Sequence, residues 1–70
     1  MITNDEIDNW FTYHKPTQNQ LSKYEYLRTE AKLLAYLIME LTPACPDQTV
    51  AIRKLRESIM AANAAIACND

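Results

Sequence analysis

The segment TPACP, at Thr42–Pro46, decides the fold of this chain because it separates two long helical patterns. Proline lacks a backbone N–H and its ring clashes with the preceding turn, so Pro43 and Pro46 do not fit a helix interior. The connection is only five residues long, which is short enough to turn the chain back on itself. We therefore expect the two long helices to be antiparallel neighbours.

The segment before this connection is predicted to form a helix over residues 17–41. Thr17 and Gln20 have the three-residue spacing of a capping box. Spacings of three and four place one apolar set on a single helix face: Tyr24, Leu27, Ala31, Leu34, Ile38 and Leu41. A second apolar and aromatic set lies off that face: Tyr26, Leu33, Tyr36 and Leu37. One partner helix cannot cover both sets, so we expect an exposed apolar patch of the kind that marks an interface.

The segment after the connection is predicted to form a helix over residues 47–67. Its apolar residues again alternate spacings of three and four: Ile52, Leu55, Ile59, Ala62 and Ile66. The last two turns are rich in alanine, whose small side chain lets helices approach closely. Asn63 stands within this run, where a lone polar residue either fixes the register of an oligomer or contacts a ligand. The pattern leaves both roles open.

A shorter helix is expected over residues 3–12. Thr3 and Glu6 form a second capping-box pattern, and Ile7, Trp10 and Phe11 share one face. A helix this short is not stable alone, so its apolar face must dock on the rest of the chain. The sequence therefore predicts an all-α protein with a single helical-hairpin domain over residues 1–70, in which a short N-terminal helix precedes an antiparallel two-helix hairpin.

The small size of the chain favours self-association. A 70-residue chain buries only roughly 60% of its unfolded surface, so a lone monomer would be marginal. Cys45 and Cys68 cannot form an intramolecular disulfide, because about 23 helical residues at ~1.5 Å each separate them. Two free thiols are typical of a reducing cytosol. We therefore predict a homo-oligomer.

Several functional classes are disfavoured by the sequence. The formal charge of −2 argues against general DNA or RNA binding, and no apolar run is long enough to span a membrane. The polar, acidic start of the chain does not resemble a signal peptide. A glycine-rich phosphate loop is excluded because the chain has no glycine, and neither cysteine has a catalytic motif around it. The acidic residues Asp5, Glu6 and Asp8 suit the positive end of a helix better than a metal site. We expect no enzyme activity, no metal and no cofactor.

The elbow YHKPT, at Tyr13–Thr17, is the best candidate for a binding site. Tyr13 offers an aromatic face, Lys15 a positive charge, and the start of the following helix offers free backbone N–H groups. Arg28 lies further along that helix. Such a combination suits a flat anionic ligand, such as a nucleotide. The alternatives are that Tyr13 is a packing aromatic and that Arg28 is a solvated or ion-paired surface residue.

Three motifs in the chain resemble those of a known family. They are Phe11-x-Tyr13-His14-x-Pro16, then Tyr24-x-x-Leu27-Arg28-x-x-Ala31-Lys32, then Met60-x-x-Asn63-Ala64-Ala65-Ile66-Ala67. Together they resemble the helical-hairpin family of phage anti-CBASS sponges, whose hairpin is shared with sponges that act against Thoeris signalling. The resemblance covers roughly residues 10–68.

The resemblance implies a compact homohexamer in the host cytoplasm that holds a defence messenger without hydrolysing it. Members bind cyclic dinucleotides in pockets shared between protomers, and some bind cyclic trinucleotides in separate pockets. The pocket tyrosine and basic residue of the family match Tyr13 and Arg28, where arginine replaces the usual lysine. Ser58 and Ala64 stand where well-known members carry a glycine and an arginine, which argues against the trinucleotide pocket.

Residues and resemblance together predict these ligand-binding residues: Tyr13, His14, Lys15, Pro16, Arg28, Lys32 and Asn63. The predicted partners are a cyclic di- or trinucleotide and further copies of the chain. Two other functions remain open. One is a sponge for cyclic ADP-ribose isomers, and the other is a helical interaction module whose exposed apolar faces bind and inhibit a host protein.

Overall fold

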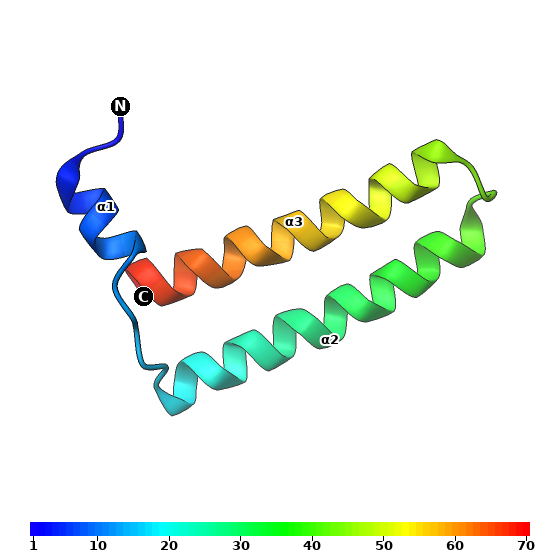
Figure 1. Ribbon diagram of the computed structural model, residues 1–70. Coiled ribbons are helices and arrows are strands. Elements are labelled where there is room, and N and C mark those ends of the chain that lie inside the picture. Colours follow the sequence, from blue (N-terminus) through cyan, green and yellow to red (C-terminus); the bar gives the residue numbers. More distant parts are fainter.

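The computed structural model describes all 70 residues, which form three helices and no strand (Figure 1). α1 spans Asn4–Trp10, α2 spans Gln18–Leu41 and α3 spans Pro46–Asn69. α2 and α3 lie side by side and run in opposite directions, while α1 contacts α3 at the end of the hairpin that holds both chain termini. The all-α architecture and the antiparallel hairpin predicted from the sequence are confirmed.

The starts of α1 and α2 are fixed by the capping boxes that the sequence predicts. In the first, the Glu6 backbone N–H donates to Thr3 Oγ1 at 3.1 Å, and the Thr3 N–H donates to the Glu6 carboxylate at 3.4 Å. Thr17 and Gln20 make the same reciprocal pair at 3.1 and 3.0 Å. α3 begins at Pro46, one residue earlier than expected, because the fixed φ of proline suits the first helical position.

The hairpin turn depends on Gln48, whose side chain closes the end of α2. Thr42 is extended, with φ −120° and ψ 150°, as expected of a residue that precedes a proline. This bend leaves the last carbonyls of α2 without helical partners. The Gln48 side-chain amide donates to both the carbonyl oxygen and the hydroxyl of Thr42 at 3.1 Å. Gln48 is the most buried residue of the chain, at 9% exposed.

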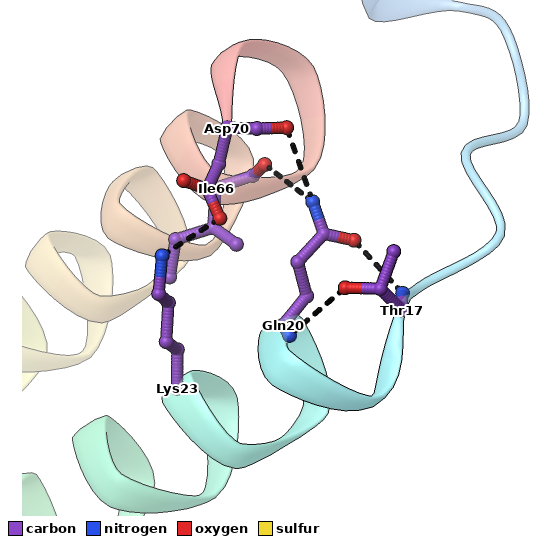
Figure 2. Close-up of polar contacts among 5 residues, drawn as sticks. All are labelled: Thr17, Gln20, Lys23, Ile66 and Asp70. Carbon is purple, nitrogen blue, oxygen red and sulfur yellow. Dashed lines mark hydrogen bonds and ion pairs between the residues drawn. The ribbon is translucent and has the colours of Figure 1, made fainter.

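The opposite end of the hairpin is held by Gln20 and Lys23, as Figure 2 shows. The Gln20 side-chain amide donates to the carbonyl oxygens of Ile66 and Asp70, both at 3.3 Å. Lys23 forms an ion pair with the Asp70 carboxylate at 2.8 Å, although both side chains are largely exposed and such pairs contribute little to stability. The Gln20 amide adds a second donor to the Ile66 carbonyl, which also accepts the Asp70 backbone N–H at 3.2 Å.

The α2–α3 interface is made of half-buried side chains only. The α3 residues at this interface are those predicted: Ile52, Leu55, Ile59, Ala62 and Ile66. On α2 the half-buried residues are Gln20, Tyr24, Leu27, Ala31, Ala35 and Ile38. No hydrophobic side chain anywhere in the chain is buried, so each long helix uses one narrow stripe against its neighbour.

The prediction was wrong for two residues of the α2 stripe. Leu34 and Leu41 are 45% and 71% exposed. Ala35 takes the interface position instead of Leu34, because the stripe continues from Ala31 by a spacing of four before it reaches Ile38. The small side chain of Ala35 allows α3 to pass close by, and both leucines are left on the outside of the hairpin.

The chain exposes far more surface than a compact protein of its mass. Its accessible surface is 5952 Å², compared with about 4,500 Å² expected for a folded 8.1 kDa monomer. The radius of gyration is 15.2 Å, compared with about 11 Å for a compact domain of this length. The second apolar set of α2 is exposed as predicted: Tyr26, Leu33, Tyr36 and Leu37. A single hairpin therefore leaves a large apolar surface uncovered.

Other features of the chain agree with the sequence. Cys45 and Cys68 are both free thiols at opposite ends of α3. Neither long helix contains a stretch apolar enough to cross a lipid bilayer.

Replacing Gln48 with alanine should destabilise the hairpin. The substitution removes the Gln48 hydrogen bonds to Thr42, and a typical hydrogen bond contributes about 0.5–1.5 kcal/mol to the free energy of unfolding. Urea unfolding at one fixed protein concentration measures this loss. Gln18→Ala is the control, since Gln18 is exposed and its side chain makes no hydrogen bond. Equal unfolding midpoints for the two variants would show that Gln48 does not hold the turn.

Candidate functional site

The elbow between α1 and α2 presents Tyr13 to solvent and uses His14 to hold its own shape. Tyr13 is 82% exposed, and Lys15 is also exposed, whereas His14 and Pro16 are half-buried. The His14 Nε2–H donates to the carbonyl oxygen of Asn9 at 2.7 Å. A carbonyl can only accept, so the Nε2 atom carries the proton.

Asn9 connects this elbow to the hairpin. Its side-chain amide donates to the carbonyl oxygen of Cys68 at 3.0 Å, near the end of α3. The chain of contacts from His14 through Asn9 to Cys68 therefore fixes the elbow beside the C-terminal end of α3. Pro16 then directs the backbone into α2, and the aromatic ring of Tyr13 is left free for a partner.

A hollow of about 380 Å³ lies between the middle portions of α2 and α3. Three cationic residues contribute to its lining, Arg28 and Lys32 from α2 and Arg56 from α3, but its surface is almost entirely apolar, so they line it with their aliphatic stems. Its remaining lining is aliphatic: Ala31, Ala35, Ile52, Leu55, Ile59 and Met60. No acidic side chain lines it. Such an apolar surface suits the flat apolar face of a ligand or the apolar side chains of a partner.

A second hollow lies further toward the start of α2 and is also lined by Arg28. Tyr24, Glu25 and Leu21 line it from α2, and Asn63 lines it from α3. The Asn63 side-chain carbonyl is buried and accepts no hydrogen bond within the chain. Buried polar atoms are normally paired, so this oxygen is suited to a donor on a ligand or on a second copy of the chain.

The predicted site residues are thus divided between the two hollows and the elbow. Arg28 and Lys32 share the first hollow, and Arg28 and Asn63 share the second. Tyr13 and Lys15 line neither hollow. Arg28 lies about ten residues into α2, which is roughly 15 Å along the helix from its start. Within one chain, the elbow and the two hollows are therefore separate surfaces.

Arg28 and Lys32 have no acidic partner. The chain contains two ion pairs, Lys23–Asp70 and Lys54–Glu57, and neither involves the residues of the first hollow. Of the two alternatives for Arg28, an ion pair is absent from the single chain, while a solvated surface position agrees with its exposed side chain. Its positive charge remains available to an anion.

A family model described as "Acb2/Tad1, hairpin domain" matches residues 3–67 of the chain. The chain belongs to the Acb2/Tad1 hairpin family. Comparisons with curated proteins and with solved structures found no match. The resemblance inferred from the three sequence motifs is confirmed, and the match also takes in α1. Membership of this family implies a phage sponge that sequesters cyclic nucleotides.

Arg56 is the one cationic residue lining the first hollow that the sequence analysis did not select. Its neighbours in the sequence form no recognisable motif, and the resemblance does not mark it. The signal was present in the hairpin register, because Lys32 and Arg56 each lie twelve residues from Ala44, at the centre of the turn. Residues at equal distances from the turn face each other across an antiparallel pair.

Proposed function

We propose that this protein binds cyclic oligonucleotide immune messengers, cyclic dinucleotides first among them, and sequesters them without cleavage. In the host cytoplasm this would block CBASS signalling. Family membership supports a cyclic nucleotide as the ligand. The observation that carries the choice of site is the first hollow, an aliphatic surface lined in part by Arg28 and Lys32, neither of which forms an ion pair within the chain.

The chemistry of a cyclic dinucleotide suits these groups. Each ligand has two phosphates and two flat bases. A charge-assisted hydrogen bond from Arg28 to a phosphate contributes about 1.5–3 kcal/mol, and the planar guanidinium can use two N–H groups at once. A base stacked on an aromatic ring such as Tyr13 contributes about 1–3 kcal/mol. One stack and one phosphate contact in each half of a two-fold symmetric ligand give tight binding.

The proposed site is completed by a second copy of the chain. Tyr13 and Arg28 do not share a hollow within one chain, yet the predicted pocket needs both. Self-association also accounts for the uncovered apolar surface of α2. We propose a homohexamer in which the elbow of one protomer, including Lys15 and Pro16, approaches the Arg28 surface of another.

Sequestration is favoured over catalysis by the role of the sole histidine. The Nε2–H of His14 is engaged by the Asn9 carbonyl at 2.7 Å, so this side chain acts as a support for the elbow. No group of three or more His, Cys, Asp or Glu side chains gathers in a metal-binding arrangement. In this proposal the messenger is held by non-covalent contacts and is not chemically converted.

Calorimetric titration with the pure protein should detect binding of at least one cyclic dinucleotide, and denaturing the complex should return that ligand intact. The panel should include cyclic dinucleotides, cyclic trinucleotides and cyclic ADP-ribose isomers, with chromatography of the recovered material. Binding only of a cyclic ADP-ribose isomer would move the function to Thoeris signalling. Recovery of a linearised nucleotide would contradict sequestration, and binding of no ligand would favour a module that inhibits a host protein.

Tyr13→Ala should weaken binding of the cyclic dinucleotide by roughly 1–3 kcal/mol while the assembly keeps its mass, because one base loses its stacking partner. Arg28→Ala should weaken binding by about 1.5–3 kcal/mol. Arg28→Lys should weaken binding by less, since lysine keeps the positive charge but cannot donate two parallel N–H groups to one phosphate. Affinity and assembly mass are measured on the same samples.

The matched control for these variants is Arg53→Ala, because Arg53 lies outside both hollows. If Tyr13→Ala dissociates the assembly, Tyr13 is a packing residue. If Arg28→Ala binds like Arg53→Ala, the ligand does not use Arg28.

A further inference from the structure

Phe11, at the end of α1, is the most exposed aromatic side chain of the chain, at 84%. Tyr13 follows two positions later and is 82% exposed, while Ile7 and Trp10 on α1 are 44% and 48% exposed. α1 therefore covers only part of its apolar surface against α3. A cluster of apolar side chains left in water at one end of a molecule is typical of a contact surface for a partner.

The first hollow is an apolar surface of the size that an aromatic ring needs. Its volume is about 380 Å³, and its floor is formed by aliphatic side chains such as Ile59. A benzene ring fits an apolar cavity of about 150 Å³. The hollow therefore has room for one phenyl ring and for part of a second flat group beside it.

Phe11 does not reach the hollow of its own chain. The Asn9 side chain binds the Cys68 carbonyl oxygen and so holds α1 at the end of α3. Met60 lines the hollow and lies eight residues before Cys68, which is about 12 Å along the helix. Figure 1 shows α1 at this end of the hairpin, away from the middle of α2 and α3. An aromatic ring that fills the hollow must therefore come from another molecule.

We propose that Phe11 of one copy inserts into the first hollow of a second copy, so that α1 is a docking arm between protomers. This rests on the proposed function, in which Tyr13 of one copy meets Arg28 of another, and it names the contact that brings them together. Phe11 and Tyr13 are two residues apart, so their Cα atoms are separated by at most about 7 Å. Because Arg28 lines the hollow, a docked Phe11 places Tyr13 of the first copy near it.

Charge complementarity supports a second copy as the occupant. The arm carries three exposed acidic residues, Asp5, Glu6 and Asp8. The residues that line the hollow include three cationic ones and no acidic one. Arginine and lysine cover apolar surface with their aliphatic stems while their charged ends stay in water, where an acidic arm passes alongside. Opposite charges on two such surfaces favour this pairing over a contact between two arms.

The available surface is also large enough. The chain has about 1,450 Å² more accessible surface than a compact monomer of its mass, and a stable interface takes about 800 Å² from each partner. Each copy has one arm and one hollow. A closed assembly in which copies exchange arms therefore fills every hollow and leaves no arm unpaired.

Disulfide trapping between two variants tests the contact directly. Both variants carry Cys45→Ser and Cys68→Ser; one adds Phe11→Cys and the other adds Met60→Cys, a hollow residue that is 61% exposed. After the two are refolded together and mildly oxidised, intact-mass spectrometry should find a disulfide-linked pair of unlike chains. The control replaces the second variant with Val50→Cys, which is 51% exposed and lies outside the hollow. Absence of the Phe11–Met60 pair, or an equal yield with Val50→Cys, overturns the inference.

A second measurement compares the assembly of Phe11→Ala, Phe11→Leu and Val50→Ala by sedimentation without ligand. Phe11→Ala should raise the dissociation constant of the assembly at least about tenfold, because a buried phenylalanine contact is lost. Phe11→Leu should have a smaller effect, and Val50→Ala should have little. Since Phe11 is exposed in the single chain, circular dichroism should show unchanged helix content. If Phe11→Ala assembles as Val50→Ala does, the hollow is not filled by Phe11.

These measurements fail separately from the proposed function, because neither one uses a ligand. If the trapped pair forms and no cyclic nucleotide binds, the docking arm stands and the proposed function fails. If cyclic di-AMP binds and the trapped pair does not form, the proposed function stands and the docking arm is wrong. Phe11→Ala should recover its affinity for cyclic di-AMP at protein concentrations that restore the assembly, whereas Tyr13→Ala should not. A lasting loss in the reassembled Phe11→Ala protein would contradict a docking role.

Discussion

A hairpin of two helices has no interior, and this constraint governs the rest of the structure. Each long helix has one neighbour, so it can cover one stripe of side chains and no more. The result is an interface of half-buried residues and a chain in which no hydrophobic side chain is buried. Apolar burial between α2 and α3 is therefore modest. Hydrogen bonds at the two ends of the hairpin then make a larger share of the contribution to its stability.

Those end contacts come from two glutamines whose side-chain amides donate to backbone carbonyls at the C-terminal ends of the helices. Gln48 closes the end of α2 in a turn that has no glycine, and Gln20 closes the end of α3. His14 and Asn9 add a third contact that fixes the elbow to the same end of α3. The hairpin register that these contacts impose also brings Lys32 and Arg56 to opposite sides of one hollow. The same polar contacts that stabilise the fold thus position the charges.

The uncovered surface and the separated site residues have a common explanation. A chain with about 1,450 Å² more surface than a compact monomer of its mass is suited to association with further copies. Association also offers the only way for the Tyr13 ring of one chain to meet the Arg28 surface of another, because one chain keeps them apart. Under the proposed function, assembly and ligand binding would both follow from the surface that a single hairpin leaves uncovered.

Much of this fold could be predicted from local patterns. The prolines of Thr42–Pro46 indicate the turn, and the two capping boxes mark where α1 and α2 begin. Leu34 was misplaced because a spacing rule does not reveal where a small residue such as Ala35 lets two helices approach. Gln48 and Arg56 were missed for a different reason. Their roles depend on contacts between segments, which appear only when the two helices are placed side by side.

The site is less predictable than the fold for the same reason. Arg28 and Lys32 lie four residues apart on one helix, so their shared surface could be recognised from the sequence. The position of Asn63 beside Arg28 required the hairpin register. In the proposed assembly the roles of Tyr13, Lys15 and Pro16 would depend on a second copy of the chain, and a single sequence does not specify how copies meet.

Native mass spectrometry with and without a cyclic dinucleotide tests the central claim most directly, because one spectrum reports both assembly and ligand. The claim is that the hairpin is an incomplete unit whose ligand site is finished by another copy. It predicts a defined multiple of the 8.1 kDa chain that carries intact ligand, with no ligand on the monomer. A spectrum dominated by the 8.1 kDa monomer, whether bare or carrying the ligand, would contradict it.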